Sequence, residues 1–224
     1  MPPLRQHYAL DTDDRLVRYD EAVRILREQG EPERYYCPGC NREVHISLTT
    51  KSFIHNTSRH CVNETYIHNL AVQMLRARFD DGSRDFMIGT KRNVLCKDFR
   101  TCSFYTGGYE CRGEDIVRFD LKKVYDRCDF PSGNLSFPAD LVLHDNAGKM
   151  PSVYILIRTD YLAPLDLPPD VLLIEIAVKD EHAVELLSGD PILECGDKVH
   201  CLYYGPWKRR GSVSSRKLCE KDRL

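Results

Sequence analysis

Two hydrophobic patterns run along the first third of the chain. Short apolar runs flank the polar residues 11–14, which predicts a β-hairpin over residues 7–18. Further on, apolar positions recur at spacings of three and four residues, which is typical of helices. These spacings predict a short helix from Asp20 to Leu26 and a longer, more regular one after Asn63. We expect Asp20 and Asn63 to cap these helices, because both side chains accept hydrogen bonds from free backbone N–H groups.

The second half of the chain is rich in predicted strands. Apolar segments at 139–144 and 153–158 are separated by a polar turn. The segment 171–178 is apolar almost throughout, which predicts a strand buried on both faces at the centre of a sheet. A short helix over 180–187 and a last strand over 199–204 are expected to follow. The pattern therefore predicts an α/β (α+β) fold, a mixed sheet flanked by helices.

The middle of the chain shows neither pattern clearly. Residues 96–111 mix cysteines with tyrosine and glycine and are expected to form a loop, whereas residues 119–125 are expected to form a short helix. The predicted domains are a hairpin, helix and cysteine-rich part over 1–62, an α/β domain over 63–206 with a cysteine-containing insertion at 94–130, and a basic tail over 207–224.

Composition limits the choice of partners. With 224 residues, 42% hydrophobic and 29% charged, the chain is long enough for a proper core. Its formal charge of -2 gives no whole-protein attraction to nucleic acid, so binding would need a local basic patch. Lys208, Arg209 and Arg210 are the candidate nucleic-acid contacts; the alternative is that they form a solvated terminus.

Cellular location is predicted from what the sequence lacks. No apolar run approaches the roughly 20 residues of a membrane-spanning helix, and the first residues show no apolar signal core. We therefore expect a cytoplasmic protein that does not enter membranes, in which thiols stay reduced. Its ten cysteines are then expected to be metal ligands and buried thiols rather than disulfides.

The clearest chemical motif is a cysteine knuckle. Cys37 and Cys40 flank a Pro-Gly turn that brings both sulfurs to one side, and His55, His60 and Cys61 follow at the distance that a structural zinc site requires. We predict a closed, four-coordinate zinc site made by Cys37, Cys40, His55 and Cys61, with His60 as the alternative to Cys61. The competing interpretation is two free surface thiols and a core histidine.

A second set of cysteines is spaced widely and irregularly. Its members could hold a further ion or form a partly buried group of small apolar thiols. They are Cys96, Cys102, Cys111 and Cys128.

Carboxylates near the start of the long helix and on a strand provide a candidate catalytic site. Glu64 and His68 lie one helical turn apart and share a face, and Asp140 belongs to the first predicted strand of the α/β domain. Magnesium-dependent nucleases use carboxylates of this kind. The alternative is that Glu64 favours the helix dipole and Asp140 borders a turn.

The order of several motifs resembles the competence protein CoiA-like family. The motifs are 36–40, 53–55, 64–71, 119–126, 139–143 and 173–179. The resemblance covers residues 6–204. It implies an N-terminal zinc knuckle, a C-terminal domain of the PD-(D/E)XK nuclease superfamily, a function in DNA processing, competence or mobile elements, and magnesium or manganese as cofactor of an active member.

Two positions depart from that family's pattern. Leu156 stands where the second strand of the nuclease motif carries an acid, and leucine cannot bind magnesium. Asp160, or Glu175 together with Lys179, could take over that function. Ser52 replaces the first histidine of the family's knuckle loop, which leaves His55 as the histidine ligand.

Three functions remain open from the sequence. The leading hypothesis is a nuclease-fold protein that has lost catalysis and acts by binding DNA or a protein partner. The alternatives are an active metal-dependent DNA nuclease and a protein–protein interaction module with no function in nucleic-acid handling.

Overall fold

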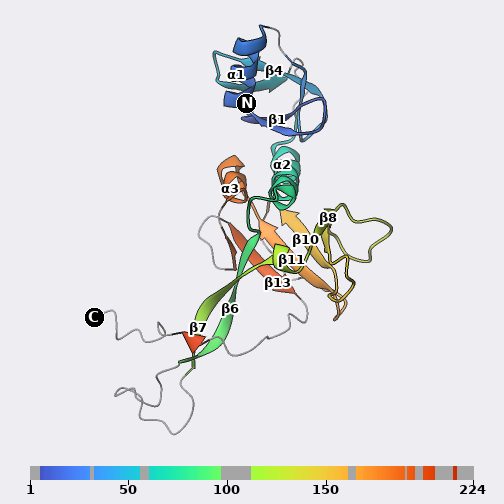
Figure 1. Cartoon of the computed structure of the whole chain (residues 1–224). Coiled ribbons are helices and arrows are strands. Elements are labelled where there is room, and N and C mark those ends of the chain that lie inside the picture. The colour runs from blue at the N-terminus through green and yellow to red at the C-terminus, as the bar shows by residue number, and fades with distance from the viewer. Residues whose placement is uncertain are drawn as a thin grey trace, which may run out of the picture.

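The fold is known from a computed structural model. It describes residues 6–30, 33–55, 61–96, 112–160, 165–189, 191–194, 199–204 and 214–215. Within these ranges the chain forms three β-sheets and three α-helices, with the long helix α2 between the two five-stranded sheets (Figure 1). The predicted α+β class is confirmed.

The N-terminal sheet is antiparallel and built from short strands. Its strands are β1 (Tyr8–Leu10), β2 (Leu16–Arg18), β3 (Tyr35–Tyr36), β4 (Glu43–Ser47) and β5 (Ser52–His55). They lie in the order β2-β1-β3-β4-β5. Tyr8 pairs with Arg18 across the first two strands, which confirms the predicted hairpin.

Both predicted helix caps are wrong, Asp20 by two residues and Asn63 by one. Helix α1 spans Tyr19–Gln29 with Arg18 at the N-cap, and α2 spans Asn63–Asp80 with Val62 at the N-cap. Neither cap residue makes a side-chain hydrogen bond to its helix. Asp20 and Asn63 lie inside the first turn instead, where an acid such as Asp20 still favours the helix dipole.

The second sheet contains the strands predicted from the apolar segments. It consists of β8 (Arg127–Asp129), β9 (Leu141–His144), β10 (Val153–Arg158), β11 (Leu172–Ala177) and β13 (His200–Tyr204). The order is β13-β11-β10-β9-β8, and only β10 and β11 are parallel among these described strands. β11 is flanked on both sides and buried, as its apolar sequence predicted. Helix α3 (Glu181–Leu186) follows β11.

A two-stranded ribbon was not predicted. β6 (Met87–Cys96) pairs with β7 (Arg112–Asp120) and projects away from the helices (Figure 1). The short strands β12 (Ile192–Leu193) and β14 (Ser214–Ser215) lie parallel to β6.

The helix expected over 119–125 is reduced to one turn. A 3-10 turn, η1 (Leu121–Lys123), follows β7 directly. Asp120 ends the strand, and its Oδ1 accepts hydrogen bonds from the backbone N–H groups of Phe86 and Lys122. These two bonds fix the start of the turn, so the strand extends into the residues whose spacing had suggested a helix.

One contiguous core joins the N-terminal sheet to the second sheet. Helix α2 contributes buried side chains to it, including Leu70 and Leu75, which are fully buried. Phe53 from β5 and Ile155 from β10 belong to the same cluster. The predicted domain parts therefore share apolar packing through α2.

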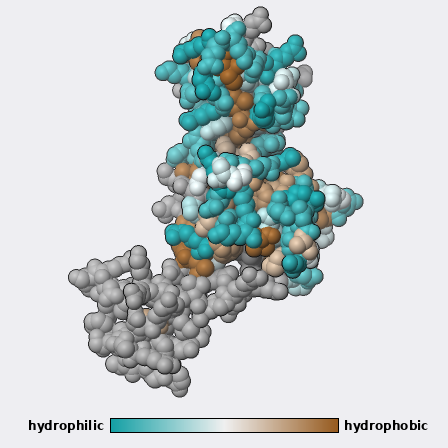
Figure 2. All heavy atoms as spheres, viewed as in Figure 1, coloured by the Kyte–Doolittle hydropathy of each residue, from teal (hydrophilic) through white to brown (hydrophobic). Residues whose placement is uncertain are grey.

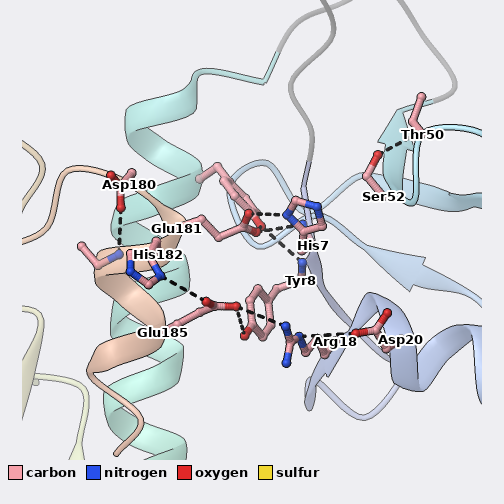
Figure 3. A network of polar contacts seen from close by, with 12 residues as sticks. His7, Tyr8, Arg18, Asp20, Thr50, Ser52, Asp180, Glu181, His182 and Glu185 are labelled. Atoms are coloured by element: carbon pink, nitrogen blue, oxygen red, sulfur yellow. Dashed lines mark hydrogen bonds and ion pairs between the residues drawn. The ribbon is translucent and has the colours of Figure 1, made fainter. Parts of the chain in front are cut away.

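A polar network adds to this packing. Glu181 on α3 accepts hydrogen bonds from the backbone N–H of His7 at 2.8 Å and from the buried Tyr66 hydroxyl (Figure 3). Its other oxygen lies 2.7 Å from His7 Nδ1. One turn on, Glu185 accepts a hydrogen bond from the Tyr8 hydroxyl at 3.0 Å. Two carboxylates of one short helix thus hold the first strand of the chain.

The visible surface is mostly hydrophilic, with hydrophobic residues scattered over it (Figure 2). The large apolar side chains that are exposed among the described residues are Leu48, Val62 and Phe130. In the part of the chain that the structure describes, no helix combines the length and apolarity needed to cross a membrane.

The Glu181 network gives a testable stability contribution. Glu181→Ala removes the acceptor of the buried Tyr66 hydroxyl, and we expect it to lower the free energy of unfolding by about 1–3 kcal/mol, the cost of an unsatisfied buried polar group. Urea unfolding measures this change. The control is Glu21→Ala on α1, whose exposed ion pair with Arg24 should contribute less than about 1 kcal/mol. Equal effects of the two substitutions would contradict the account.

Candidate metal centre

Four side chains from three segments meet beside the start of α2. Cys37 and Cys40 belong to the turn after β3, His55 ends β5, and Cys61 lies just before α2. Their ligand atoms all lie within 4.8 Å of one another. Three sulfurs and one imidazole at this separation could hold a metal ion such as zinc. The structure thus brings together the four residues that the sequence predicted as ligands.

The turn between the two cysteines is closed by backbone hydrogen bonds. Asn41 N–H donates to Cys37 O, and Cys37 N–H donates to Arg42 O, both at 2.8 Å. Asn41 adopts a left-handed φ of 51°, which asparagine tolerates better than most residues. The turn directs both cysteine side chains to one side.

Gly39 is required by the close approach of α2. A Cβ atom at this position would lie 2.8 Å from Cys61 Sγ and 2.8 Å from Tyr66 Cα. Contacts this short cannot be relieved without moving the helix backbone or a ligand. The glycine therefore sets how closely the knuckle packs on α2.

Hydrogen bonds converge on the buried sulfur. Cys37 Sγ accepts from the Gly39 N–H at 3.3 Å and from Gln6 Nε2 at 3.4 Å, and it lies 3.6 Å from Cys61 Sγ. Burial raises the pKa of both thiols, so thiolates at this depth need a compensating charge. A bound cation supplies that charge, and the N–H donors orient the sulfur.

The histidine of the cluster also has the state that a ligand needs. Burial lowers the pKa of His55, which favours the neutral ring. Its Nε2 atom is buried, with no hydrogen-bond partner among the described residues. Because buried polar atoms are normally satisfied, this lone pair fits a metal ligand.

Two other predictions concern the same loop. Ser52, in the place of the family's histidine, is fully buried, and its hydroxyl shares a hydrogen bond of 2.9 Å with the Thr50 hydroxyl. Ser52 is not a member of the cluster. His60, the alternative ligand, lies outside the described residues.

A histidine–aspartate pair adjoins the metal centre. His68 Nε2 on α2 lies 3.0 Å from Oδ1 of Asp140, which is the residue directly before β9. The other oxygen of Asp140 accepts a hydrogen bond of 2.7 Å from the Ile157 N–H on β10. The bond to Asp140 raises the pKa of His68, against burial, which lowers it. Both carboxylate oxygens of Asp140 are therefore engaged.

Glu64, the third predicted catalytic residue, is not gathered with this pair. Its side chain is exposed and makes no hydrogen bond or ion pair to another described residue. Within the described ranges, the cysteine–histidine cluster is the one group of three or more side chains placed to share an ion. The structure thus brings together two of the three predicted catalytic residues.

The two acids proposed to replace the missing one both pair with Arg158. Leu156 is buried on β10 and pairs in register with Glu175 on β11. Glu175 is fully buried, with Oε1 3.7 Å from Arg158 Nη1. Asp160 binds the same guanidinium through two hydrogen bonds of 2.7 and 2.9 Å. Lys179 is exposed after β11.

The remaining predicted sites fall largely outside the described residues. Cys102 and Cys111 lie there, as do Lys208, Arg209 and Arg210. The other two members of the second cysteine set, Cys96 and Cys128, are thiols that form no disulfide. Cys96 is partly exposed at the end of β6, and Cys128 is buried on β8, where burial raises its pKa to about 12.

Asn69 is a site residue that sequence reasoning missed. Its Nδ2 donates to Pro38 O in the knuckle at 2.9 Å, and its Oδ1 lies 3.0 Å from His68 Nδ1. The signal available in the sequence was weak. Asparagine is an unfavourable residue inside a helix, so its presence in the second turn of α2 suggests a specific hydrogen-bonding task.

Comparison with known proteins identifies no relative. No family model matches the chain, and no curated protein or solved structure matches it either. Its function is therefore inferred from the residues of the site itself.

Gly39 offers a sharp test of the metal centre. Gly39→Ala places a methyl group against Cys61 Sγ and the α2 backbone, so we expect at least a tenfold loss of zinc affinity, the loss typical of disturbed metal surroundings. Competition with a chromophoric chelator measures the affinity. Gly82→Ala is the matched control, because a methyl group there meets nothing within 4 Å. Unchanged affinity in Gly39→Ala would contradict this packing.

The His68–Asp140 pair predicts a pH dependence. The folded pKa of His68 is raised above its unfolded value near 6.5, so the stabilising ion pair is fully present below that value and is lost as pH rises through the folded pKa. A double-mutant cycle of His68→Gln and Asp140→Asn isolates the coupling from other titrating groups. We expect a larger coupling free energy at pH 6 than at pH 9 in urea unfolding. A coupling that grows with pH would contradict the assignment.

Proposed function

We propose that this chain is a zinc-containing, cytoplasmic protein of DNA handling. In this proposal a structural zinc knuckle supports a nuclease-like α/β domain that binds nucleic acid without cutting it. The metal, the nuclease-like arrangement and the partner are parts of this one proposal, and each has its own support.

Zinc is supported by the donor set. Three thiolates and one imidazole are soft and borderline ligands, which favour zinc over magnesium or calcium. Four protein ligands complete a tetrahedral shell and leave no position for a substrate or a reactive water. A closed site of this kind stabilises the fold instead of performing catalysis.

The nuclease-like arrangement is supported by the order of elements. Helix α2 precedes the mixed sheet. Asp140 lies directly before β9 and Leu156 lies on the neighbouring β10, and the Asp140 N–H donates a hydrogen bond to Ile155 O. This order agrees with the motif order of the CoiA-like family. The same resemblance supports DNA as the partner, with a protein partner as the alternative.

Loss of catalysis is supported most strongly by the state of Asp140. His68 and the Ile157 N–H engage its two oxygens, whereas magnesium requires carboxylate oxygens open to the ion. The buried Leu156 offers no oxygen. Metal-assisted hydrolysis depends on fixed coordination, so this arrangement favours binding over cutting.

The proposal is tested by measuring cleavage and binding of DNA. Supercoiled and single-stranded DNA are incubated with the purified chain and magnesium or manganese, beside Asp140→Ala. We expect no cleavage by either protein, because the described residues assemble no acidic site for a metal ion. Cleavage by the wild type that Asp140→Ala abolishes would establish an active nuclease and overturn the proposal.

Binding is measured in the same preparations as a function of salt. We expect affinity that falls steeply as salt rises, the mark of phosphate contacts. The combined substitutions Lys208→Ala, Arg209→Ala and Arg210→Ala should reduce the magnitude of the salt slope by up to about 3, roughly one per phosphate contact. Absence of binding at low salt would reject nucleic acid and leave a protein partner.

A further inference from the structure

A continuous chain of hydrogen bonds runs from the knuckle to the second sheet. It begins at Pro38 O, which accepts from Asn69 Nδ2 at 2.9 Å. It continues from Asn69 Oδ1 to His68 Nδ1 at 3.0 Å, and from His68 Nε2 to Asp140 Oδ1 at 3.0 Å. It ends where Asp140 Oδ2 accepts from Ile157 N–H on β10. Each residue is thus hydrogen-bonded to the next, from Pro38 to Ile157.

The donors and acceptors along this chain fix the state of the His68 ring. Pro38 O can only accept, so the NH₂ group of Asn69 must face it. The Asn69 oxygen then faces His68 Nδ1, which must carry a proton. Nε2 faces a carboxylate and donates to it when Asp140 is ionised. Among the described residues, Asp140 is the ionisable side chain in contact with His68.

The first link depends on the metal centre. Pro38 lies between the ligands Cys37 and Cys40, so the direction of its carbonyl depends on a closed knuckle. Backbone hydrogen bonds shape this turn, and a bound metal would hold its two cysteines to His55 and Cys61, since binding free energy of a structural ion is folding free energy. The single side-chain amide of Asn69 faces two partners. Its Nδ2 donates to Pro38 O in the knuckle, and its Oδ1 faces Nδ1 of the His68 ring.

We propose that Asn69 is a positioning residue that couples the metal centre to the His68–Asp140 pair. Metal binding holds Pro38 O in place, Pro38 O orients the Asn69 amide, and the amide keeps Nδ1 of His68 protonated, with Nε2 directed at Asp140. Loss of the metal releases the ring. This inference rests on the proposed metal site, but it requires neither nucleic-acid binding nor loss of catalysis.

The test measures the protonation of the His68 ring nitrogens directly. Full-length, zinc-loaded protein carrying ¹⁵N-labelled histidine is studied by NMR at one fixed pH of about 7.5, close to the range where histidine states differ. In the wild type we expect the Nδ1 signal of His68 at the position of a protonated, hydrogen-bonded nitrogen. Asn69→Leu removes the amide at similar volume, and the signal should shift towards that of an unprotonated nitrogen.

A second variant separates positioning from structural support. Asn69→Asp keeps an oxygen acceptor for His68 Nδ1, so the protonated signal should be restored. His144, whose Nδ1 lies 3.0 Å from Ser152 Oγ, is the internal control and should stay unchanged in both variants. An unshifted His68 signal in Asn69→Leu, or failure of Asn69→Asp to restore it, would overturn the positioning function.

Metal removal tests the coupling itself. After chelation of the wild type, the His68 signal should shift as it does in Asn69→Leu, while the His144 signal reports that the second sheet remains folded. An unchanged His68 signal after complete metal removal would overturn the coupling. Failure of the DNA experiments would leave this result unaffected, so the two proposals fail separately.

Discussion

The meeting of three sulfurs and one imidazole at the base of the N-terminal sheet is the constraint on which the rest of the structure depends. That sheet is made of strands of two to five residues, too short to bury a large core of their own. The cluster ties the turn after β3, the end of β5 and the entry to α2 together. These segments, far apart in sequence, are thereby joined at one point in addition to the apolar core that they share.

Helix α2 carries this constraint into the second half of the chain. One side of the helix contacts the knuckle so closely that only glycine fits at position 39. The buried side chains of the helix enter the shared core. On its second turn, Asn69 reaches the knuckle and His68 reaches Asp140, directly before β9. Glu181 and Glu185 on α3 hold β1 in addition. The histidine and aspartate that suggested a nuclease therefore have a structural explanation as part of this junction.

Features of this structure that depend on local sequence patterns could be predicted better than features that depend on contacts between distant segments. The Cys37–Cys40 spacing places two sulfurs together within one turn, so the cluster followed from sequence, as did the strands with strong apolar periodicity. The predicted helix caps were off by two residues and by one residue, because the N-caps, Arg18 and Val62, carry no capping signal. The β6–β7 ribbon was missed because its polar sequence has no clear alternation. The Asn69 contact depends on an approach of two segments that no local pattern specifies.

Metal coordination by the four predicted ligands is tested most directly by zinc X-ray absorption spectroscopy of the purified protein. We expect a shell of three sulfur atoms at about 2.3 Å and one nitrogen at about 2.0 Å around each zinc ion. Replacement of His55 by alanine should remove the nitrogen from that shell and leave the sulfur distances. A spectrum with only oxygen and nitrogen neighbours, or a folded protein that binds no zinc, would contradict it.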